Sequence, residues 1–588
     1  MAPLRLIGFA GEVPKVQPRL LPNAAAQRAE NVRLEDGGLV PIRRRRLARQ
    51  FSDAVPGTIF SVYRHKGEWL RWTSRVSAAP GPVAQDRLYI MGDGAPKMRV
   101  GGKTYPLAVP KPSARMSAAV IGDPEDAGDE SPDITTRIYT YTFVTAFGEE
   151  SAPAAVSNEV EWQPGQAVVL SGFLKAPKGR NITKQRIYRS QTGATGETTL
   201  NFLTERNASD SEFTDRAAQD EFGEVVPSTD WNAPPDTLEG LISLPNGMMA
   251  AFQGNDLYFC EPWYPHAWPQ KYVLTTDYPI VALGAFGASV VVLTKGMPYL
   301  VTGTAPDSMS MERIEQNLPC INAAGVVDLG YAVAYPSHDG LVLVSANGAS
   351  VATEATLGTE GWRALNPSTL VAGEYRGRYI ASFEAISSQG VAERGAVILN
   401  VAGGSGDITR CNAASSAMFN DQETGSLFFL DGVSVYEFDA PGQPYEVYRW
   451  RSKQFLAPLL EPSLGAILIQ TVVPKTPAQL KREDAERQAI ISRNRARLDA
   501  PLAGALDGAS FNVHFVNGDD LEVIPQEVYA EVRLFADGQL VATTRKLNAI
   551  TRLPAGYRGQ LIEMEITGTA QIAEVRLGTT PSDVAQVT

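Results

Sequence analysis

The amino-acid sequence predicts a mainly β protein made of several compact parts. Short runs of β-branched and aromatic residues recur along the chain, and turn residues separate them. The 52 glycines and 40 prolines among 588 residues exceed average usage and supply those turns. At roughly 150 residues per domain, a chain of this length is expected to form about four domains. A single stretch near residue 480 has the pattern of a long helix.

The first segment, residues 1–50, is expected to be an extended N-terminal arm. A short helical turn is predicted around Ala24–Glu30, with Asn23 as its N-cap. A basic run follows Val40-Pro-Ile42 and consists of Arg43, Arg44, Arg45 and Arg46. These arginines are candidate contacts for DNA or an acidic partner. A solvated strand end is the simpler interpretation, since four charges make a small patch.

Residues 51–112 and 236–455 are predicted to share one β-propeller, which residues 113–235 interrupt. The first stretch contains strand-like runs such as Ile59–Tyr63 and Arg87–Met91. In the second stretch, strand clusters recur about every 40–50 residues, which is the spacing of propeller blades. No strict sequence repeat accompanies this spacing, so the prediction rests on the pattern alone.

Residues 113–235 are predicted to form an acidic linker and an inserted β-sandwich. Gly122–Pro132 holds five acidic residues and two prolines, which is typical of an exposed linker. Its aspartates are spaced three apart, whereas an EF-hand loop needs a spacing of two, so a calcium site is not expected. Thr136–Thr145 alternates with period two and resembles a fibronectin type III strand.

Residues 456–500 are predicted to be a connector that contains a helix over residues 476–498. Thr476 suits the N-cap, and Pro477 suits the first turn. The second half of the helix is basic and carries Arg487, Arg493, Arg495 and Arg497. The helix either lines a channel or docks on a neighbour through these residues, or it lies as an amphipathic helix on its own domain. The thin apolar face leaves both interpretations open.

Residues 501–588 are predicted to form a small C-terminal β-module. Tyr529–Phe535 and Gln539–Thr544 flank an Ala-Asp-Gly turn, which indicates a hairpin. Leu561–Thr567 and Ile572–Leu577 alternate as two further strands.

Charge and cysteine usage narrow the classes of partner and compartment. The 53 basic and 65 acidic residues give a net charge of −12, which does not suit a general nucleic-acid binder. The cysteines Cys260, Cys320 and Cys411 fit neither a zinc spacing nor a disulfide framework, so folding in a reduced cytosol is expected. The N-terminus lacks the apolar core of a signal peptide, and no apolar stretch is long enough to span a bilayer.

The sequence offers no set of residues for catalysis. The four histidines are far apart, and Gly403–Asp407 fails the nucleophile-elbow pattern at its last position. Gly101-Gly-Lys-Thr104 lacks the first glycine of a phosphate-binding loop. We therefore expect no enzyme activity, no cofactor and no metal site.

The stretch Gly240–Thr302 is rich in aromatic residues. Two apolar runs around Gly254-Asn255 predict a hairpin, and a proline-rich loop follows over Glu261–Pro269. Trp263, Tyr264 and Trp268 in this loop are candidate platforms for sugar rings. Packing of these aromatics within their own loop is the favoured alternative, because prolines preorganise such packing.

An ordered set of short motifs resembles the nozzle, or tail tubular protein B, family of short-tailed phages. The motifs run from the arm to the C-terminal module and are Gly11–Pro22, Ala26–Asn31, Pro245–Met248, Tyr258–Pro262, Pro265–Pro269, Thr294–Gly296, Ser337–Leu341, Trp450–Lys453 and Leu553–Gly559. The resemblance implies a structural virion protein that forms a ring, expected to be a homohexamer, at the distal end of the tail. It implies a β-propeller in each subunit and a gated passage for genomic DNA.

The implied partners and location follow from that role. They are other copies of the chain, a tail adaptor or tubular protein above the ring, duplex DNA in transit, and, as further candidates, tail fibres or spikes and the host surface. The protein would be made in the host cytoplasm and assembled into the virion tail. Two alternatives stay open: a receptor-binding or carbohydrate-active tail component, and a host cytosolic propeller scaffold.

The conduit hypothesis also predicts the electrostatics of the passage. Its lining is expected to be acidic or neutral, with basic residues in sparse rings, so that DNA slides without being held. A continuous basic groove would count against the hypothesis.

Overall fold

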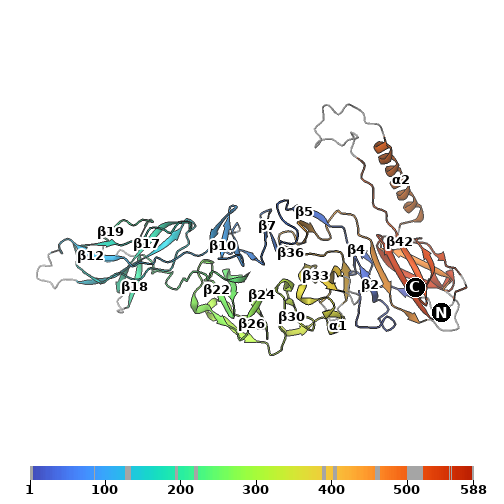
Figure 1. Ribbon diagram of the computed structural model, residues 1–588, viewed down its shortest axis with the longest axis horizontal. Coiled ribbons are helices and arrows are strands. Elements are labelled where there is room, and N and C mark those ends of the chain that lie inside the picture. The colour runs from blue at the N-terminus through green and yellow to red at the C-terminus, as the bar shows by residue number, and fades with distance from the viewer. Residues whose placement is uncertain are drawn as a thin grey trace. The chain divides into compact units, whose positions relative to one another are not determined.

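The computed structural model describes residues 4–84, 86–125, 134–192, 197–217, 223–386, 392–401, 407–456, 464–473, 475–499, 521–554, 556–557 and 559–585. Within these residues the protein is mainly β and is built from many small sheets (Figure 1). The predicted fold class is confirmed at this level. Parts of the acidic linker (residues 126–133) and the start of the C-terminal module (residues 501–520) lie outside the described residues.

The chain divides into two compact units. The first unit comprises Met1–Pro56, Pro336–Leu343 and Ser350–Thr588, and the second comprises Gly57–Tyr335 and Val344–Ala349. The N-terminal segment therefore belongs to the same compact unit as the C-terminal one. The six sequence-based segments stay a prediction.

The second unit contains a hairpin and antiparallel four-stranded meanders. The hairpin pairs β6 (Ser61–His65) with β7 (Glu68–Trp72). The meanders are β8 (Ser77–Pro80), β9 (Leu88–Met91), β10 (Lys97–Val100) and β11 (Lys103–Pro106); β20 (Glu239–Ser243), β21 (Met249–Gln253), β22 (Asp256–Phe259) and β23 (Leu274–Thr275); and β24 (Ile280–Phe286), β25 (Ser289–Thr294), β26 (Tyr299–Thr302) and β27 (Ser310–Arg313).

Turn chemistry and close packing explain these meanders. The predicted hairpin is confirmed, because β21 and β22 meet at Gly254-Asn255 with Gln253 opposite Asp256. Gly254 has φ 61°, a conformation that glycine adopts without strain. On β24, a Cβ added to Gly284 would lie 2.5 Å from the Val333 side chain, so a residue without a side chain lets the two segments approach. Buried residues of β8–β10 share one core with β21 and β22, and β21 and β22 share another with β24–β26.

A fourth meander of the same design follows along the chain. It consists of β28 (Val327–Asp328), β29 (Ala332–Pro336), β30 (Leu341–Ser345) and β31 (Gly348–Val351).

Two sheets and a strand pair form a separate part of the second unit. One sheet has β12 (Ser117–Ile121), β16 (Ala167–Ser171) and β19 (Phe213–Asp215); the other has β14 (Tyr139–Thr145), β17 (Ile182–Thr192) and β18 (Thr198–Asn207); the pair is β13 (Thr135–Arg137) with β15 (Val160–Trp162). Tyr141 and Ile187 of one sheet share a core with Ala118 and Leu170 of the other. We call this part the two-sheet insert.

The first unit contains a ten-stranded sheet. Its main path runs β32 (Val371–Tyr375), β33 (Arg378–Ile386), β34 (Ala392–Leu399), β35 (Ile408–Cys411), β2 (Ala26–Glu30), β39 (Tyr448–Ser452), β45 (Leu561–Gly568), β42 (Ala530–Ala536) and β43 (Gln539–Thr544), and β40 (Phe455–Leu456) also pairs with β45.

Three smaller sheets complete the first unit. They are β1 (Leu4–Leu6), β46 (Ile572–Gly578), β41 (Ala466–Thr471) and β44 (Thr551–Arg552); β36 (Met418–Asp421), β37 (Ser426–Asp431), β38 (Ser434–Glu437) and β5 (Arg46–Gln50); and β3 (Val32–Arg33) with β4 (Val40–Pro41). The N-terminal segment thus supplies strands to each of these sheets and to the ten-stranded sheet.

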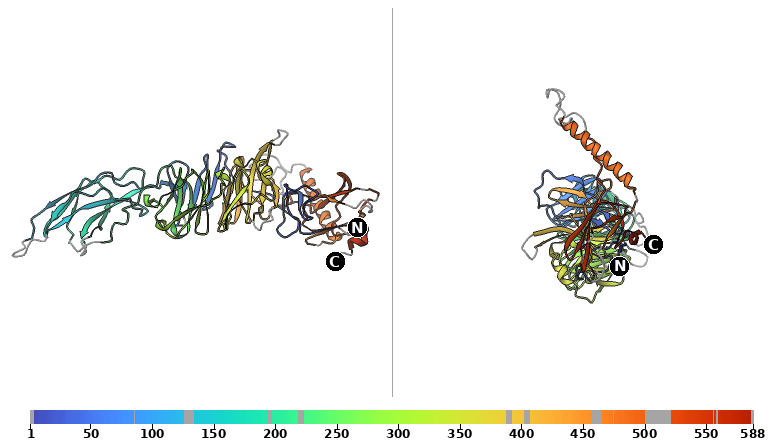
Figure 2. Two further views of the ribbon diagram at one scale, coloured as in Figure 1. Left: turned by 90° about the horizontal axis from the view of Figure 1, so that it is seen from below. Right: turned by 90° about the vertical axis from the view of Figure 1, so that its right-hand side faces the viewer.

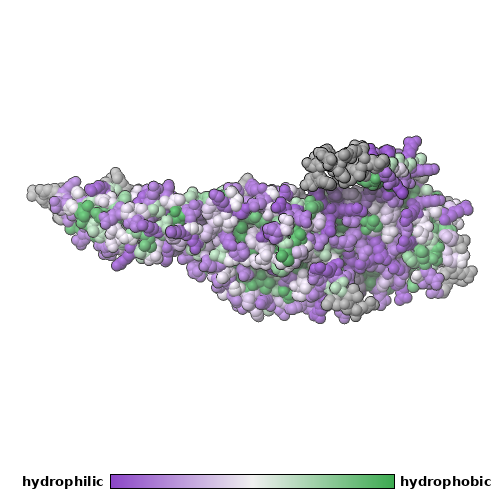
Figure 3. Space-filling view, turned by 45° about the horizontal axis from the view of Figure 1, so that its top comes forward, coloured by the Kyte–Doolittle hydropathy of each residue, from purple (hydrophilic) through white to green (hydrophobic). Residues whose placement is uncertain are grey.

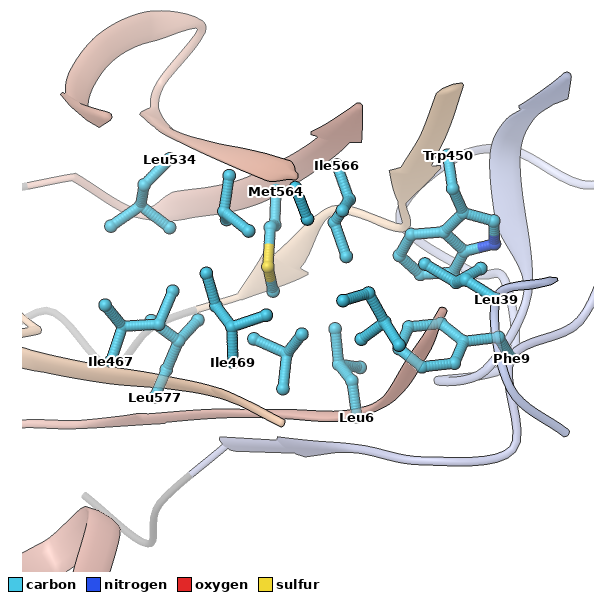
Figure 4. Packing of buried hydrophobic residues seen from close by; sticks show 14 of the residues in the cluster. Leu6, Phe9, Leu39, Trp450, Ile467, Ile469, Leu534, Met564, Ile566 and Leu577 are labelled. Atoms are coloured by element: carbon cyan, nitrogen blue, oxygen red, sulfur yellow. The ribbon is translucent and has the colours of Figure 1, made fainter. Parts of the chain in front are cut away.

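The predicted helical turn at Ala24–Glu30 is wrong, because these residues contain strand β2. Ala29 pairs with Trp450, and Glu30 pairs with both Arg449 and Arg410. These partners lie about four hundred residues away in sequence, so local propensity could not reveal them. The strand is held by a large core in which Leu6, Phe9 and Leu39 pack with Trp450, Met564 and Ile566 (Figure 4).

The predicted long helix is confirmed as α2 (Pro477–Asp499). Thr476 forms the expected cap, since the Gln479 N–H donates to Thr476 Oγ1 at 3.3 Å. The Thr476 N–H in turn donates to Gln479 Oε1 at 2.8 Å, a reciprocal bond that was not predicted. Figures 1 and 2 show α2 projecting from the sheets of its own unit. The shorter helices are α1 (Gly358–Arg363), α3 (Pro581–Ala585) and the 3₁₀ turns Pro245–Gly247, Gln270–Tyr272, Pro306–Ser308, Ala323–Gly325 and Pro367–Thr369.

Candidate functional site

The first predicted arginine group, Arg43 to Arg46, lies beside β37, β38 and residues 444–446. Arg45 pairs with Asp431 at 2.7 Å, and its guanidinium lies 4.1 Å from the centre of the Tyr436 ring. Arg46 donates from Nε to Glu437 at 3.0 Å. Arg44 faces Glu446 at 4.0 Å, and Arg43 lies over the Tyr445 ring at 5.7 Å. Three of the four arginines therefore have a carboxylate partner, which neither sequence interpretation included.

The second predicted group lies on α2, and three of its four arginines contact the extended segment 521–529. Arg493 makes two hydrogen bonds to the Glu522 carboxylate, at 2.9 and 2.6 Å, and Arg497 approaches the same group at 3.3 Å. Arg487 lies 3.7 Å from both Asp484 and Glu527, and Arg495 lies 3.7 Å from Asp499. The hydrogen bond from Arg493 lowers the pKa of the Glu522 carboxyl.

The same extended segment connects the two groups. Gln526 accepts from the Tyr445 N–H at 2.6 Å and donates to the Tyr445 carbonyl at 2.6 Å. The Tyr445 ring is the one over which Arg43 lies. Two arginine groups more than four hundred residues apart in sequence are thus linked through Tyr445 and this segment.

A third charged group, absent from the sequence prediction, covers one face of the ten-stranded sheet. The opposite face carries Trp450, Val532 and Met564, which are buried in the shared core. Figure 4 shows Trp450 and Met564 in this core. Side chains alternate across a strand, so the residues between them point the other way. We call this group the arginine–glutamate face; it consists of Arg449, Arg451, Glu531, Arg533, Arg545, Glu563 and Glu565.

The glutamates of this face hold the arginines by hydrogen bonds. Arg449 donates twice to Glu565, at 2.9 and 2.7 Å. Arg451 donates twice to Glu563, at 2.8 and 2.5 Å. These charge-assisted bonds fix the guanidinium groups in place.

The same kind of arginine–glutamate hydrogen bond occurs on β42 and directly after β43. Glu531 accepts from Arg533 and from Arg545, each at 2.7 Å. The hydrogen bond from Arg545, followed by that from Arg533, lowers the pKa of the Glu531 carboxyl. In register, Glu565 stands between Arg451 and Arg533 on the neighbouring strands. The row continues on β2, where Arg28 is opposite Arg451.

Burial orders the charges of this face into two layers. The side chains of Glu563 and Glu565 are 4% and 6% exposed, whereas those of Arg449 and Arg545 are 46% and 62% exposed. The carboxylates thus lie against the sheet, and the guanidinium groups form the outer layer. An approaching molecule meets positive charge first, although the local sum is close to neutral.

Sequence reasoning missed this face because its residues come from three distant segments. The available signal was local: Arg449-Trp-Arg451 and Glu563-Met-Glu565 alternate charged with apolar residues. That pattern predicts a strand with one charged face. It does not reveal that the two strands are neighbours.

The aromatic loop Glu261–Pro269 separates into a buried part and an exposed part. Trp268 is 1% exposed and donates from Nε1 to the Pro265 carbonyl at 2.8 Å. His266 is buried as well, and its Nε2 donates to the Glu150 carbonyl at 3.0 Å. Burial lowers the pKa of His266 to about 4. This part of the loop contacts a turn of the two-sheet insert through His266. Trp268 is therefore a structural residue.

The exposed part of the loop carries Trp263 and Tyr264, whose exposed fractions are 55% and 43%. Trp263 has φ 67°, an unusual conformation for a bulky residue. A Cβ added to Gly247 would lie 2.5 Å from the indole, so the ring lies on that glycine. Tyr264 packs on Trp231 with ring centres 4.4 Å apart. On the face shown in Figure 3, hydrophobic residues occur only in small groups.

Neither the possible metal ligands nor the cysteines form a grouped site in the described part of the chain. Within the part of the chain that the structure describes, no three His, Cys, Asp or Glu side chains are grouped to hold a metal ion. Cys260, Cys320 and Cys411 are free and buried, and burial raises the pKa of each thiol to about 12. Among the described helices, none is long and apolar enough to cross a membrane.

Comparisons with known proteins assign no family. No family model matches the chain, and no curated protein matches it. Among solved structures, the chain is similar to the N-terminal domain of Nup159, with 11% identity, a TM-score of 0.20, and coverage of 48% of this chain and 66% of that one.

Two further structures show likenesses of the same strength. For the extracellular domain of a putative one-component system from B. thetaiotaomicron, identity is 7%, the TM-score is 0.21, and coverage is 92% of this chain and 62% of that one. For YCF48 from Cyanidioschyzon merolae, identity is 9%, the TM-score is 0.20, and coverage is 66% of this chain and 97% of that one. The chain spans less than two thirds of the first two structures. At these TM-scores the likenesses support no argument about function.

Proposed function

We propose that this protein is a structural component of a phage tail that forms the distal nozzle ring and conducts genomic DNA into the host. The ordered motifs from Gly11 to Gly559 support the proposal. The expected partners are other copies in a hexameric ring, a tail adaptor above it and DNA in transit, and the location is the virion tail. The proposal includes no enzyme activity and no cofactor.

The finer architecture is part of this proposal. The antiparallel four-stranded meanders that follow one another along the chain have the strand order of propeller blades. In a further sheet, β5 from the N-terminal segment pairs with β38, so distant parts of the chain complete one sheet. We interpret the two-sheet insert as the fibronectin type III-like sandwich, because its two sheets share one core.

The observation that carries the proposal is the charge compensation of the arginines. Seven of the eight predicted contact arginines have a carboxylate within 4.0 Å. The arginine–glutamate face has the same design. A guanidinium that already has a carboxylate partner gains little from a phosphate, so such surfaces bind DNA weakly. Weak contact suits a passage through which DNA moves.

Negative-stain electron microscopy of the purified protein tests the ring. We expect closed rings with six-fold symmetry, since head-to-tail interfaces close into rings. A preparation that stays monomeric at high concentration, and in the presence of the other tail proteins, would overturn the proposal.

A second candidate function is attachment to a host receptor, and the exposed ring of Trp263 favours it. The indole is backed by Gly247 on one side and presents much of its surface to solvent. A Trp263→Ala variant would then lose adsorption to host cells while still assembling into tails. Trp268→Ala is not a useful comparison, because that side chain is buried and its loss destabilises the loop. Unchanged adsorption of Trp263→Ala particles would exclude the role.

A further inference from the structure

We propose that the arginine–glutamate face is the surface along which the phosphate backbone of duplex DNA slides. This inference rests on the proposed function and names the part of the chain that makes the contact. The eight arginines chosen from the sequence do not belong to this face.

The layering of charge is the first argument. Arg449 and Arg533 each have 46% of their side chain exposed, and the glutamates below them are nearly buried. A polyanion that approaches from solvent meets guanidinium groups before it meets carboxylates. The planar guanidinium also matches phosphate geometry in a way that an ammonium group does not.

The regular spacing is the second argument. Neighbouring strands lie about 4.8 Å apart, and residues on one face of a strand repeat about every 6.7 Å. Arg449 and Arg451 occupy β39, Arg533 lies on β42, and Arg545 directly follows β43. The face therefore offers a grid of equivalent contacts rather than one pocket. Equivalent neighbouring contacts let a regular polymer move by one step without losing binding energy.

The buried carboxylates set the strength of the contact. The four arginines and three glutamates of the face sum to a charge of +1. Each phosphate has to compete with a glutamate that already accepts hydrogen bonds from the same guanidinium. The contact is consequently weak, and few counterions are released on binding. Removal of a glutamate should tighten binding, which is the distinctive consequence of this design.

Binding of a fluorescent random-sequence DNA duplex to the full-length protein, followed by anisotropy over a range of salt concentrations, tests the inference. The wild-type protein is expected to bind weakly. The double variant Arg449→Gln, Arg533→Gln should lower the affinity several-fold and reduce the salt slope by about one unit for each lost phosphate contact. Glu565→Gln should raise the affinity roughly threefold or more, because it leaves Arg449 without its carboxylate.

Arg313→Gln is the matched control. Arg313 lies on β27 of the second unit, is 42% exposed and pairs with Asp277 and Glu315 at 3.0 and 2.8 Å. Its loss removes one exposed, paired arginine that does not belong to the face and should leave the affinity unchanged. Circular dichroism and thermal melting confirm that each variant folds. If Glu565→Gln does not fold, Glu531→Gln supplies the same test, since it removes a carboxylate partner from Arg533 and from Arg545.

Three results would overturn the inference. The first is an unchanged affinity of the Arg449→Gln, Arg533→Gln variant, and the second is weaker binding by Glu565→Gln. The third is loss of ring assembly by the arginine variant with DNA binding intact, which would make the face a contact between protein subunits. If rings form normally but substitutions in the face leave the DNA affinity unchanged, only this inference is contradicted and the proposed function stands. If no rings form but the DNA affinity still depends on the residues of the face, only the proposed function is contradicted.

Discussion

The arginine–glutamate face and the two-sheet insert both bury carboxylates, but they treat the partner arginines differently. On the face, Glu563 is 4% exposed while Arg451, its partner, is 31% exposed. In the insert, Asp215 and its partners Arg137 and Arg189 are all 2% exposed or less. The comparison teaches that burial of the acid alone does not mark a surface for binding. Exposure of the base decides whether a partner can reach it.

Replacement of Asp215 in the buried cluster of the insert, which we call the sealed cluster, should cause the largest loss of stability. Asp215 accepts from Tyr139 at 2.9 Å and from Arg189 at 3.1 Å, and Arg137 lies 3.6 Å away. Asp215→Asn removes the buried negative charge that two buried guanidinium groups share. We expect local stability to fall by about 3–5 kcal/mol. Native-state hydrogen exchange of the β14 and β17 amides measures this loss.

Asp210→Asn provides the control for that experiment. Asp210 pairs with Lys175 at 3.3 Å, and both side chains are more than half exposed. Its replacement should change the same exchange rates by less than about 0.5 kcal/mol. Equal effects of the two variants would contradict the distinction between sealed and open pairs.

The second prediction concerns pH and the sealed His266. Its pKa is about 4 in the folded protein and near 6.5 when unfolded, so the unfolded state binds more protons between these values. Stability should therefore fall as the pH drops from about 6.5 towards 4, by up to roughly 3 kcal/mol. His266→Gln should reduce this slope. Burial raises the pKa of nearby Glu149, which has the opposite sign, but Glu149 is present in both proteins.

That comparison requires urea unfolding of the wild-type and His266→Gln proteins at several pH values. The difference between the two proteins isolates the histidine. Parallel stability curves for the two proteins between pH 4 and 6.5 would show that His266 does not titrate as its burial implies.

On the arginine–glutamate face, replacement of a buried carboxylate should reduce the stability by less. Glu565→Gln removes two hydrogen bonds from Arg449, but that guanidinium can turn to water. We expect a loss of about 1–2 kcal/mol by hydrogen exchange of the β45 amides. A loss as large as that of Asp215→Asn would mean that the face is sealed in solution.

The smallest effect is expected on α2. Arg495 is 83% exposed and lies 3.7 Å from Asp499, so the pair is hydrated. Arg495→Ala should change stability by no more than about 0.5 kcal/mol, as measured by thermal melting. A clear destabilisation would show that this arginine makes a contact in an assembled form of the protein.

Local sequence signals predicted the elements whose cause is local. The α2 helix was predicted within one residue at each end, because its cap, proline and charge pattern lie inside the segment. The hairpin at Gly254-Asn255 followed in the same way from its turn pair. The turn predicted at Ala24–Glu30 failed because β2 exists through its pairing with β39 and β35.

Local sequence signals predicted even less about the partners of the charged residues. The sequence indicated where arginines cluster, but not that Arg45 and Arg46 meet Asp431 and Glu437, which are almost four hundred residues away. The arginine–glutamate face depends on β39, β42 and β45 being neighbours. That arrangement is set by the shared core on the other side of the sheet, which no short motif encodes.

Cryo-electron microscopy of the virion tail, with DNA still inside, tests the central claim most directly. The account predicts a six-fold ring of this chain at the distal tip, with the arginine–glutamate face of each subunit turned towards the DNA density. It would be contradicted by a tail tip without this protein, or by a ring in which that face is buried between subunits or faces outward.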